Sequence, residues 1–323
     1  MRPIASWVII LAAILSSSIA GAQTRPARRA ATRPATKPIL PPAPPGVVIQ
    51  QDVQFLDPDR IERLDLYLPA DREPGVRSPA VVMIHGGGWV GGDKAAAREF
   101  NVGTTLARAG YVCASVNYQL KEGERWPTNL LDCKNGVRFL RANAERLGVD
   151  SKRIGVMGGS AGGHLALMVA YTSGIEALEP KSPYPEQSSA VRCVIDLYGI
   201  TNLLTRRKTD ADGDAVGEPN NRTALFKTTA DEDPALWNLA SPVSHVSKTS
   251  PPTLILHGAA DATVNREQAT ELAATLKQHG VEHQLMLIDG VGHTFDLERW
   301  KGKPLPQDLR PIVLDFFAKH LKN

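Results

Sequence analysis

The stretch that decides the fold is Arg153-Ile154-Gly155-Val156-Met157-Gly158-Gly159-Ser160-Ala161-Gly162-Gly163-His164. It begins with a short apolar run that is typical of a buried strand, and the residues from 164 to 170 have a helical composition. Between the two, residues 158–162 read G-x-S-x-G. A strand, a sharp turn and a helix around this pattern predict a nucleophile elbow, a strained turn that holds the Ser160 hydroxyl clear of the backbone. The alternative is a glycine-rich turn without chemistry.

A serine hydroxyl needs a neighbouring base to act as a nucleophile, and candidate partners follow later in the chain. Asp261 comes after the apolar run 252–258, and His293 comes after a second strand-like run, 283–288. Both therefore lie in loops at the C-terminal ends of strands, where open α/β sheets place their sites. The order of serine, acid and histidine is the one that a serine hydrolase built on such a sheet requires. We therefore predict these three residues as a catalytic triad.

A group that stabilises negative charge is also expected. His85-Gly86-Gly87-Gly88-Trp89 follows the apolar run 80–84. Consecutive glycines let backbone N–H groups point into a cavity, where such donors stabilise a tetrahedral intermediate by roughly 3–4 kcal/mol each. An HGGG-type motif has this role in lipases and esterases, and the alternative is again a turn without chemistry. Which two of the three glycines donate stays open at this point.

Strand-like and helical segments alternate along the rest of the chain. This alternation predicts the α/β class, with a mostly parallel central sheet and helices on both faces. Residues 199–249 fit no strong period, and we expect a small, flexible lid insertion there. The predicted strands are 48–55 and 63–68 (an antiparallel hairpin), 80–85, 111–117, 153–157, 191–198, 253–257 and 284–288, and the predicted helices are 94–108, 128–147, 266–279 and 311–321.

Over roughly residues 50–321 the chain resembles the α/β-hydrolase superfamily, and more narrowly its bacterial esterase and lipase group. That group is related to hormone-sensitive lipase and to small secreted acetyl and feruloyl esterases. The resemblance implies Ser160 as nucleophile, His293 as general base and then acid, and Asp261 as the orienting carboxylate. It also implies an oxyanion hole formed by the backbone N–H groups of Gly87, Gly88 and Ala161. The motifs that carry it are 85–89, 116–118 (V-N-Y), 158–164, 241–242 (S-P), 257–258 with position 261, and 292–293.

The expected activity is hydrolysis of short acyl esters by a secreted serine esterase. The substrate is expected to be a small molecule or an ester carried on a polysaccharide, with an acetyl or feruloyl ester of plant polysaccharide favoured by the resemblance. One alternative is a peptidase of the prolyl-oligopeptidase type, which shares the triad order. Such relatives carry a large extra β-propeller, and 323 residues leave no room for one. The other alternative is a catalytically inactive, ligand-binding homologue.

The N-terminal region is expected to direct export. Residues 1–22 combine Arg2, a mostly apolar core and a small-residue cleavage site, so they read as a cleavable signal peptide, with a retained anchor as the alternative. Residues 23–46 are rich in proline, alanine and arginine and are predicted to be a disordered linker. The catalytic domain is then 47–323. The expected location is secreted or periplasmic, without stable membrane insertion after cleavage.

Composition argues against several other functions. Residues 1–46 hold six basic side chains and no acid, which leaves 31 basic and 34 acidic side chains from Val47 onward. This slightly acidic body is poor evidence for a nucleic-acid partner. No C-x-x-C or H-E-x-x-H pattern occurs, so we expect no metal and no cofactor. The D-x-D-G-D run at 210–214 lacks the glutamate spacing of a calcium loop. The oligomeric state is left open.

A few further residues have both a structural and a functional interpretation. Trp89 and Trp237 are candidates for lining an acyl or sugar pocket, and each could equally be a core or rim residue. Asp132 lies in a predicted helix before Ser160, and Asp196 lies within a predicted strand, so neither is the expected triad acid. The histidines at positions 85, 164 and 257 are expected to hold loops or pack in the core.

Overall fold

The computed structural model describes residues 40–323 except for positions 74, 124 and 211. The predicted signal peptide, 1–22, and most of the predicted linker, 23–46, lie outside these residues. The helices and strands of the described residues belong to the unit that runs from Pro38 to Asn323. Among the described residues, no helix has both the length and the apolar character that crossing a bilayer requires.

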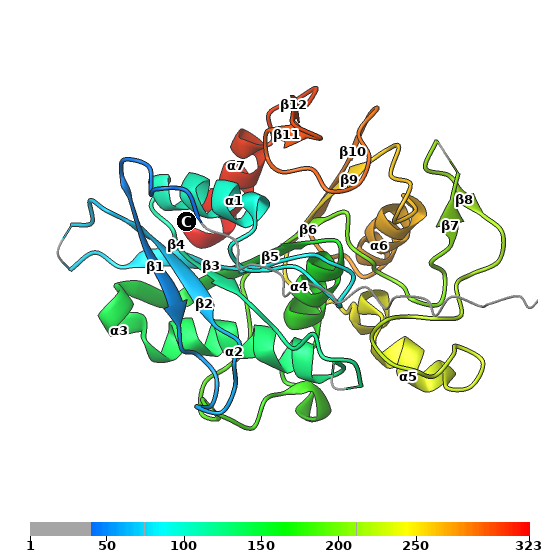
Figure 1. Cartoon of the computed structure of the whole chain (residues 1–323), viewed down its shortest axis with the longest axis horizontal. Coiled ribbons are helices and arrows are strands. Elements are labelled where there is room, and N and C mark those ends of the chain that lie inside the picture. Colours follow the sequence, from blue (N-terminus) through cyan, green and yellow to red (C-terminus); the bar gives the residue numbers. More distant parts are fainter. Residues whose placement is uncertain (1–39, 74, 124, 211) are drawn as a thin grey trace, which may run out of the picture. The chain divides into compact units, whose positions relative to one another are not determined.

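An eight-stranded sheet forms the centre of this unit, in the order β1-β2-β4-β3-β5-β6-β9-β10 (Figure 1). β1 pairs with β2 and β2 with β4 in antiparallel fashion, and the other neighbours are parallel. Strands β2, β3, β4, β6 and β9 are buried along their whole lengths, which agrees with the apolar runs that mark β3 and β9 in the sequence. The bounds are β1 Val47–Val53, β2 Leu64–Pro69, β3 Ser78–Ile84, β4 Val112–Val116, β5 Val149–Gly159, β6 Val194–Leu197, β9 Thr253–Gly258 and β10 His283–Ile288.

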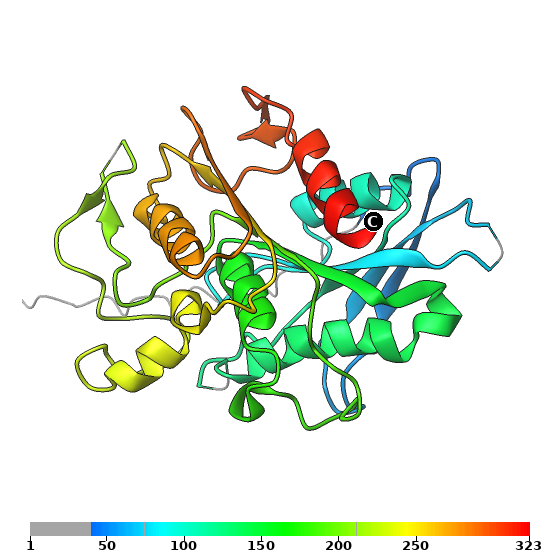
Figure 2. The same ribbon diagram turned by 180° about the vertical axis from the view of Figure 1, so that it is seen from behind.

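Helices cover both faces of the sheet, as Figures 1 and 2 show. On one face, alternate residues of the strands pack against α1 (Ala97–Arg108) and α7 (Arg310–Leu321) in one apolar cluster. On the other face they pack against α2 (Thr128–Ala142), α4 (Ala161–Tyr171) and α6 (Glu267–Gln278) in a second cluster. The predicted fold class, α/β with a mostly parallel sheet between two helical layers, is therefore confirmed. The remaining helices are α3 Ala144–Leu147 and α5 Pro234–Leu239, with short 3-10 turns η1 Glu176–Leu178 and η2 Pro242–His245.

Two predicted helices are wrong in extent, each because side chains compete for backbone groups. The helix expected over 94–108 begins at Ala97, since the Asp93 carboxylate accepts a hydrogen bond from the Ala95 N–H and forms a turn. The helix expected over 128–147 ends at Ala142. Its next residue, Asn143, donates from its side-chain amide to the Phe139 carbonyl, and the short α3 follows.

The insertion between β6 and β9 contains a small hairpin, β7 Lys208–Thr209 with β8 Ala215–Val216, followed by α5 and η2. Its first residues are fastened to α6, because Gln268 accepts hydrogen bonds from the N–H groups of Thr201 and Asn202 at 2.9 and 2.8 Å. Figure 1 shows the hairpin and α5 on the α6 side of the unit. A second hairpin, β11 Arg299–Trp300 with β12 Lys303–Pro304, follows β10.

Candidate active site

Ser160 occupies the turn between β5 and α4 in a strained conformation. Its φ of 57° and ψ of −124° lie outside the regions that side-chain-bearing residues favour. The turn is held by a hydrogen bond from the Ser160 N–H to the Leu197 carbonyl of β6, at 2.9 Å. Glycine is required at Gly158 and Gly162, because a Cβ on either would collide with backbone atoms, of Gly162 and of Ile84 respectively. This is the geometry expected of a nucleophile elbow.

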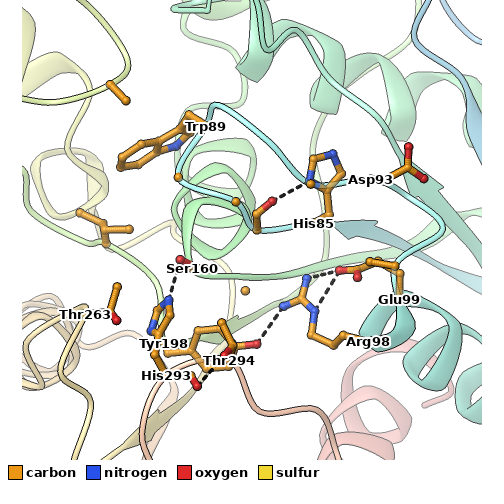
Figure 3. Close-up of a pocket in the computed structure, with 18 of the residues that line it drawn as sticks. His85, Trp89, Asp93, Arg98, Glu99, Ser160, Tyr198, Thr263, His293 and Thr294 are labelled. Atoms are coloured by element: carbon orange, nitrogen blue, oxygen red, sulfur yellow. Dashed lines mark hydrogen bonds and ion pairs between the residues drawn. The ribbon is translucent and has the colours of Figure 1, made fainter. Parts of the chain in front are cut away.

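The structure brings the three predicted triad side chains together from loops far apart in the chain. The Ser160 hydroxyl lies 2.8 Å from His293 Nε2, and His293 Nδ1 lies 2.7 Å from Asp261 Oδ2 (Figure 3 shows the first contact). His293 follows β10 and Asp261 follows β9, so both reach Ser160 from the C-terminal edge of the parallel strands. An ionised carboxylate only accepts hydrogen bonds, which places the imidazole proton on Nδ1 and leaves Nε2 free to accept from the serine.

Asp261 is completely buried, and its surroundings favour the ionised form. Burial by itself raises the pKa of this carboxyl, but hydrogen bonds from His257 and His293 and the backbone N–H of Val264 hold the pKa well below its usual range. Asp261 Oδ1 accepts from the N–H groups of Thr263 and Val264 at 2.8 and 3.0 Å, which leaves Oδ2 to face the two histidines.

His257 contacts the triad acid Asp261. From the sequence, His257 is expected only to hold a loop or to pack in the core. Its Nε2–H donates to the Val264 carbonyl at 2.9 Å, and the same nitrogen lies 3.4 Å from Asp261 Oδ2. The ring is fully buried on β9. It therefore ties the acid loop to the strand before it and supports the oxygen that faces His293.

The glycine loop after β3 lies directly against the nucleophile. A Cβ added to Gly86 would lie 2.8 Å from the Gly159 carbonyl oxygen and 3.3 Å from the Cβ of Ser160, so no larger residue fits there without displacing the elbow. Gly87 and Gly88 have φ values of 118° and 60°, a backbone path that favours glycine. Among the described residues, the N–H groups of Gly87, Gly88 and Ala161 meet no protein acceptor. They are thus free to donate to a ligand at the elbow, as the predicted oxyanion hole requires.

A cavity of about 760 Å³ opens at Ser160 and His293. Trp89 lines it, with its indole N–H donating to His164 Nδ1 at 3.3 Å. The prediction that Trp237 lines a substrate pocket is wrong. That side chain is 1% exposed, packs edge-on against Phe226 and donates to the Thr228 carbonyl at 3.2 Å, so it belongs to the core under α5.

Three supporting residues around the site have no signature in the sequence. Tyr198 packs edge-on against His293 with ring centres 4.8 Å apart, and its hydroxyl donates to the Phe295 carbonyl at 2.7 Å. Arg98 donates to Tyr198 and to the Ile84 carbonyl and pairs with the buried Glu99. Figure 3 shows this Arg98–Glu99 pair among the residues that line the cavity. The pair and the tyrosine thus brace both the histidine and the end of β3.

The other histidines singled out in the sequence, and Asp132, make contacts that stabilise the fold and take no part in the triad. His85 donates from Nδ1 to the Gly86 carbonyl at 2.7 Å and stacks on Tyr118, so it holds the glycine loop as expected. Burial lowers the pKa of His164 to about 4, which keeps Nδ1 free to accept from Trp89 while Nε2–H donates to the Ala240 carbonyl. Asp132 pairs with Arg60, away from the cavity.

Asp196 lies buried between Gly163 and Gly199, and burial raises its pKa to about 7. In the acidic loop 210–214, Asp210 Oδ1 accepts from the N–H groups of Asp212 and Asp214, and Asp214 pairs with Arg266. Asp210 and Asp214 are therefore engaged within the protein. Both carboxylate oxygens of Asp196 are buried without a hydrogen-bond partner among the described residues.

Comparison with known proteins identifies a family. The BD-FAE family model matches residues 64–276. Esterase LipC of Mycobacterium tuberculosis is 30% identical over 240 residues, which make up 74% of this chain and 58% of LipC. The chain spans a little over half the length of the mycobacterial relatives that it matches.

Solved structures share the fold. A truncated carbohydrate esterase from gut microbiota superposes with a TM-score of 0.73 at 24% identity, over 85% of this chain and 97% of that one. Native esterase 2 of Thermogutta terrifontis superposes with a TM-score of 0.67 at 27% identity, over 85% of this chain and 92% of that one. That esterase has also been solved with propionate bound and phosphorylated by paraoxon. Since the family model covers well over half of the chain and solved esterases share the fold, this protein belongs to the BD-FAE family, within the esterase group of the α/β-hydrolases.

Proposed function

We propose that this protein hydrolyses carboxylic esters through Ser160, His293 and Asp261. The observation that carries the proposal is the continuous line of hydrogen bonds from hydroxyl to imidazole to carboxylate, with lengths of 2.8 and 2.7 Å. The relatives and neighbours named above are esterases, which supports an ester as the substrate.

In the proposed reaction, Ser160 Oγ attacks the ester carbonyl carbon while its proton passes to His293 Nε2. The negative charge that develops on the carbonyl oxygen is stabilised by the unpaired N–H groups of the glycine loop and Ala161. His293 then gives the proton to the departing alcohol, and the acyl group remains on Ser160. A water molecule, deprotonated by His293, attacks this acyl-enzyme and releases the acid. Asp261 stays ionised throughout and stabilises the imidazolium form of His293.

The finer proposal is a short acyl group on an extended or polymeric alcohol such as a polysaccharide. The structural similarity to an esterase solved with propionate supports a short acyl group. A second cavity of about 390 Å³ shares Arg222, Thr223 and Ala224 with the first, and this common wall supports an alcohol that extends beyond one site.

Wild type and Ser160→Ala would be compared on 4-nitrophenyl esters from acetate to octanoate, and on acetylated and feruloylated xylan. We expect kcat to fall about 10³-fold or more in the variant and activity to decline as the acyl chain lengthens. Ser188→Ala, at an exposed serine outside the cavity, is the matched control and should behave as wild type.

Two further readouts separate the alternatives. A fluorophosphonate probe should label wild type and leave Ser160→Ala unlabelled, whereas an inactive binding homologue would remain unlabelled in both forms. Faster cleavage of a peptide 4-nitroanilide than of 4-nitrophenyl acetate would favour a peptidase. Only a few-fold loss of esterase activity in Ser160→Ala would refute the proposed mechanism.

A further inference from the structure

The catalytic cavity contains a guanidinium group that the esterase chemistry does not use. Arg206, on the insertion between β6 and β9, lines the cavity together with Ser160 and His293. Its Nη2 lies 3.5 Å from the Thr263 carbonyl, at the limit of a hydrogen bond. Its Nε is buried and has no hydrogen-bond partner among the described residues. Among its five N–H donors, the guanidinium thus makes one marginal hydrogen bond to the described part of the protein.

The acidic groups near the cavity are engaged elsewhere. Asp261 attracts Arg206 electrostatically, but both of its oxygens accept from other donors, Oδ1 from backbone N–H groups and Oδ2 from His293. Glu99 pairs with Arg98. Figure 3 shows Asp93 on the His85 side of the cavity, across from Thr263. No ion pair of Arg206 is found in the described part of the chain.

Burial lowers the pKa of the Arg206 guanidinium below its ordinary value. A partly dehydrated cation without a bonded anion is unfavourable. A ligand carboxylate would reverse this, because paired charge-assisted hydrogen bonds to a guanidinium are among the strongest in proteins.

The backbone beneath Arg206 is held in place before any ligand binds. The Arg206 N–H donates to the Asn202 carbonyl at 3.1 Å, and the Arg206 carbonyl accepts from Asn220 N–H at 2.7 Å. Asn202 is in turn bonded to Gln268 and Glu271 of α6. The guanidinium therefore projects from a fixed point, as a preformed recognition group requires.

A second cation lies on the same wall. Arg222 is exposed and lines both the catalytic cavity and the adjoining cavity. Within the described residues it has no ion-pair partner, and it interacts with Glu232 only electrostatically. The insertion thus contributes two positive charges to a cavity that the glycine loop also lines.

We propose that this cavity selects esters that carry a carboxylate, and that Arg206 binds it, with Arg222 as a second, more exposed contact. This inference rests on the proposed esterase function and narrows its substrate class. The carboxylate has two possible sources. It belongs either to the acyl group, as in a half-ester of a dicarboxylic acid, or to the alcohol, as in an acylated uronic acid.

The test uses matched pairs of charged and neutral esters, one pair for each source. For the acyl side the pair is mono-4-nitrophenyl adipate and its methyl ester. For the alcohol side it is 4-acetoxybenzoate and 4-acetoxybenzamide. Wild type, Arg206→Gln, Arg206→Lys and Arg222→Gln would be compared by kcat/KM. Arg207→Gln is the matched control, because that neighbouring side chain is exposed and does not line the cavity.

In one of the two arms, Arg206→Gln should lower kcat/KM for the charged ester roughly 10- to 100-fold, the usual effect of losing a charged hydrogen bond. The neutral partner should change less than about 3-fold. Arg206→Lys should retain part of the selectivity, since it keeps the charge without the planar fork. The preference of wild type for the charged ester should also weaken as salt is added.

Equal losses for charged and neutral esters in both arms would overturn the proposal, because Arg206 would then merely support the Thr263 loop. An unchanged charged-to-neutral ratio in every variant would overturn it as well. Either result leaves the esterase proposal intact as long as wild type hydrolyses 4-nitrophenyl acetate and Ser160→Ala does not. If Arg206→Gln fails to fold, the Lys variant and the exposed Arg222→Gln still decide the question.

Discussion

Replacing Asp261 by asparagine should reverse the hydrogen-bond direction along the whole triad. The backbone N–H groups of Thr263 and Val264 donate to Oδ1 at 2.8 and 3.0 Å, so the asparagine carbonyl oxygen must stay at that position. The NH₂ group then takes the place of Oδ2, 2.7 Å from His293 Nδ1. His293 must accept there, which moves its proton to Nε2.

With the proton on Nε2, His293 can no longer accept from the Ser160 hydroxyl at 2.8 Å. We expect kcat to fall roughly 10⁴-fold, the loss seen when a triad carboxylate is replaced by its amide and the wrong tautomer is held. This corresponds to about 5.5 kcal/mol of transition-state stabilisation. His257, whose Nε2–H lies 3.4 Å from Oδ2, would then face a second donor, so the tautomer change should be accompanied by some loss of stability.

The assay is kcat on 4-nitrophenyl acetate near pH 7, with thermal unfolding measured on the same samples. Asp289→Asn, at an exposed acid in the loop that leads to His293, is the control and should match wild type. A folded Asp261→Asn variant that keeps activity within tenfold of wild type would show that this carboxylate does not orient the base.

Two other predictions concern stability. Trp237→Ala should lower the free energy of unfolding by about 3–5 kcal/mol, as for other buried aromatic truncations. It should leave kcat/KM of the folded fraction near wild type, and a selective loss of activity without destabilisation would contradict the core assignment. In Asp196, burial raises the pKa from 3.8 to about 7, so over this window the folded state holds a proton that the unfolded chain has released. Stability therefore falls as pH rises through the window, by up to roughly 4 kcal/mol. Asp196→Asn should remove this dependence and be the more stable protein above pH 7, as measured by denaturant unfolding across pH; parallel curves for the two proteins would contradict the reasoning.

Much of this site could be predicted because its chemistry depends on local sequence. Gly158 and Gly162 are dictated by backbone contacts of the elbow itself, so they mark Ser160 without knowledge of the fold. Asp261 and His293 follow apolar strands, and parallel strands bring their C-terminal ends to one edge. The elbow glycines are therefore visible as a short motif, and the triad residues are visible from their order along the chain.

The rest depends on contacts between distant segments, which leave no periodic signal. Arg98 on α1 reaches Tyr198 after β6, and Arg206 meets Thr263 in the acid loop, so neither arginine differs in sequence from an ordinary surface residue. Trp237 illustrates the converse. A tryptophan in an irregular segment fits a pocket or a small local core equally well, and only the contacts with Phe226 and Thr228 decide between them.

The triad and the cavity arginines Arg206 and Arg222 come from different segments of the chain. Nucleophile, base and acid stand at the ends of sheet strands, whereas Arg206 and Arg222 belong to the segment between β6 and β9, joined to α6 through Gln268. Under the proposed carboxylate selectivity, the residues that choose the ester therefore lie in a different segment of the chain from those that react with it. Exchanging a charged residue of that segment would then alter which esters bind, while Ser160, His293 and Asp261 keep their positions on the sheet.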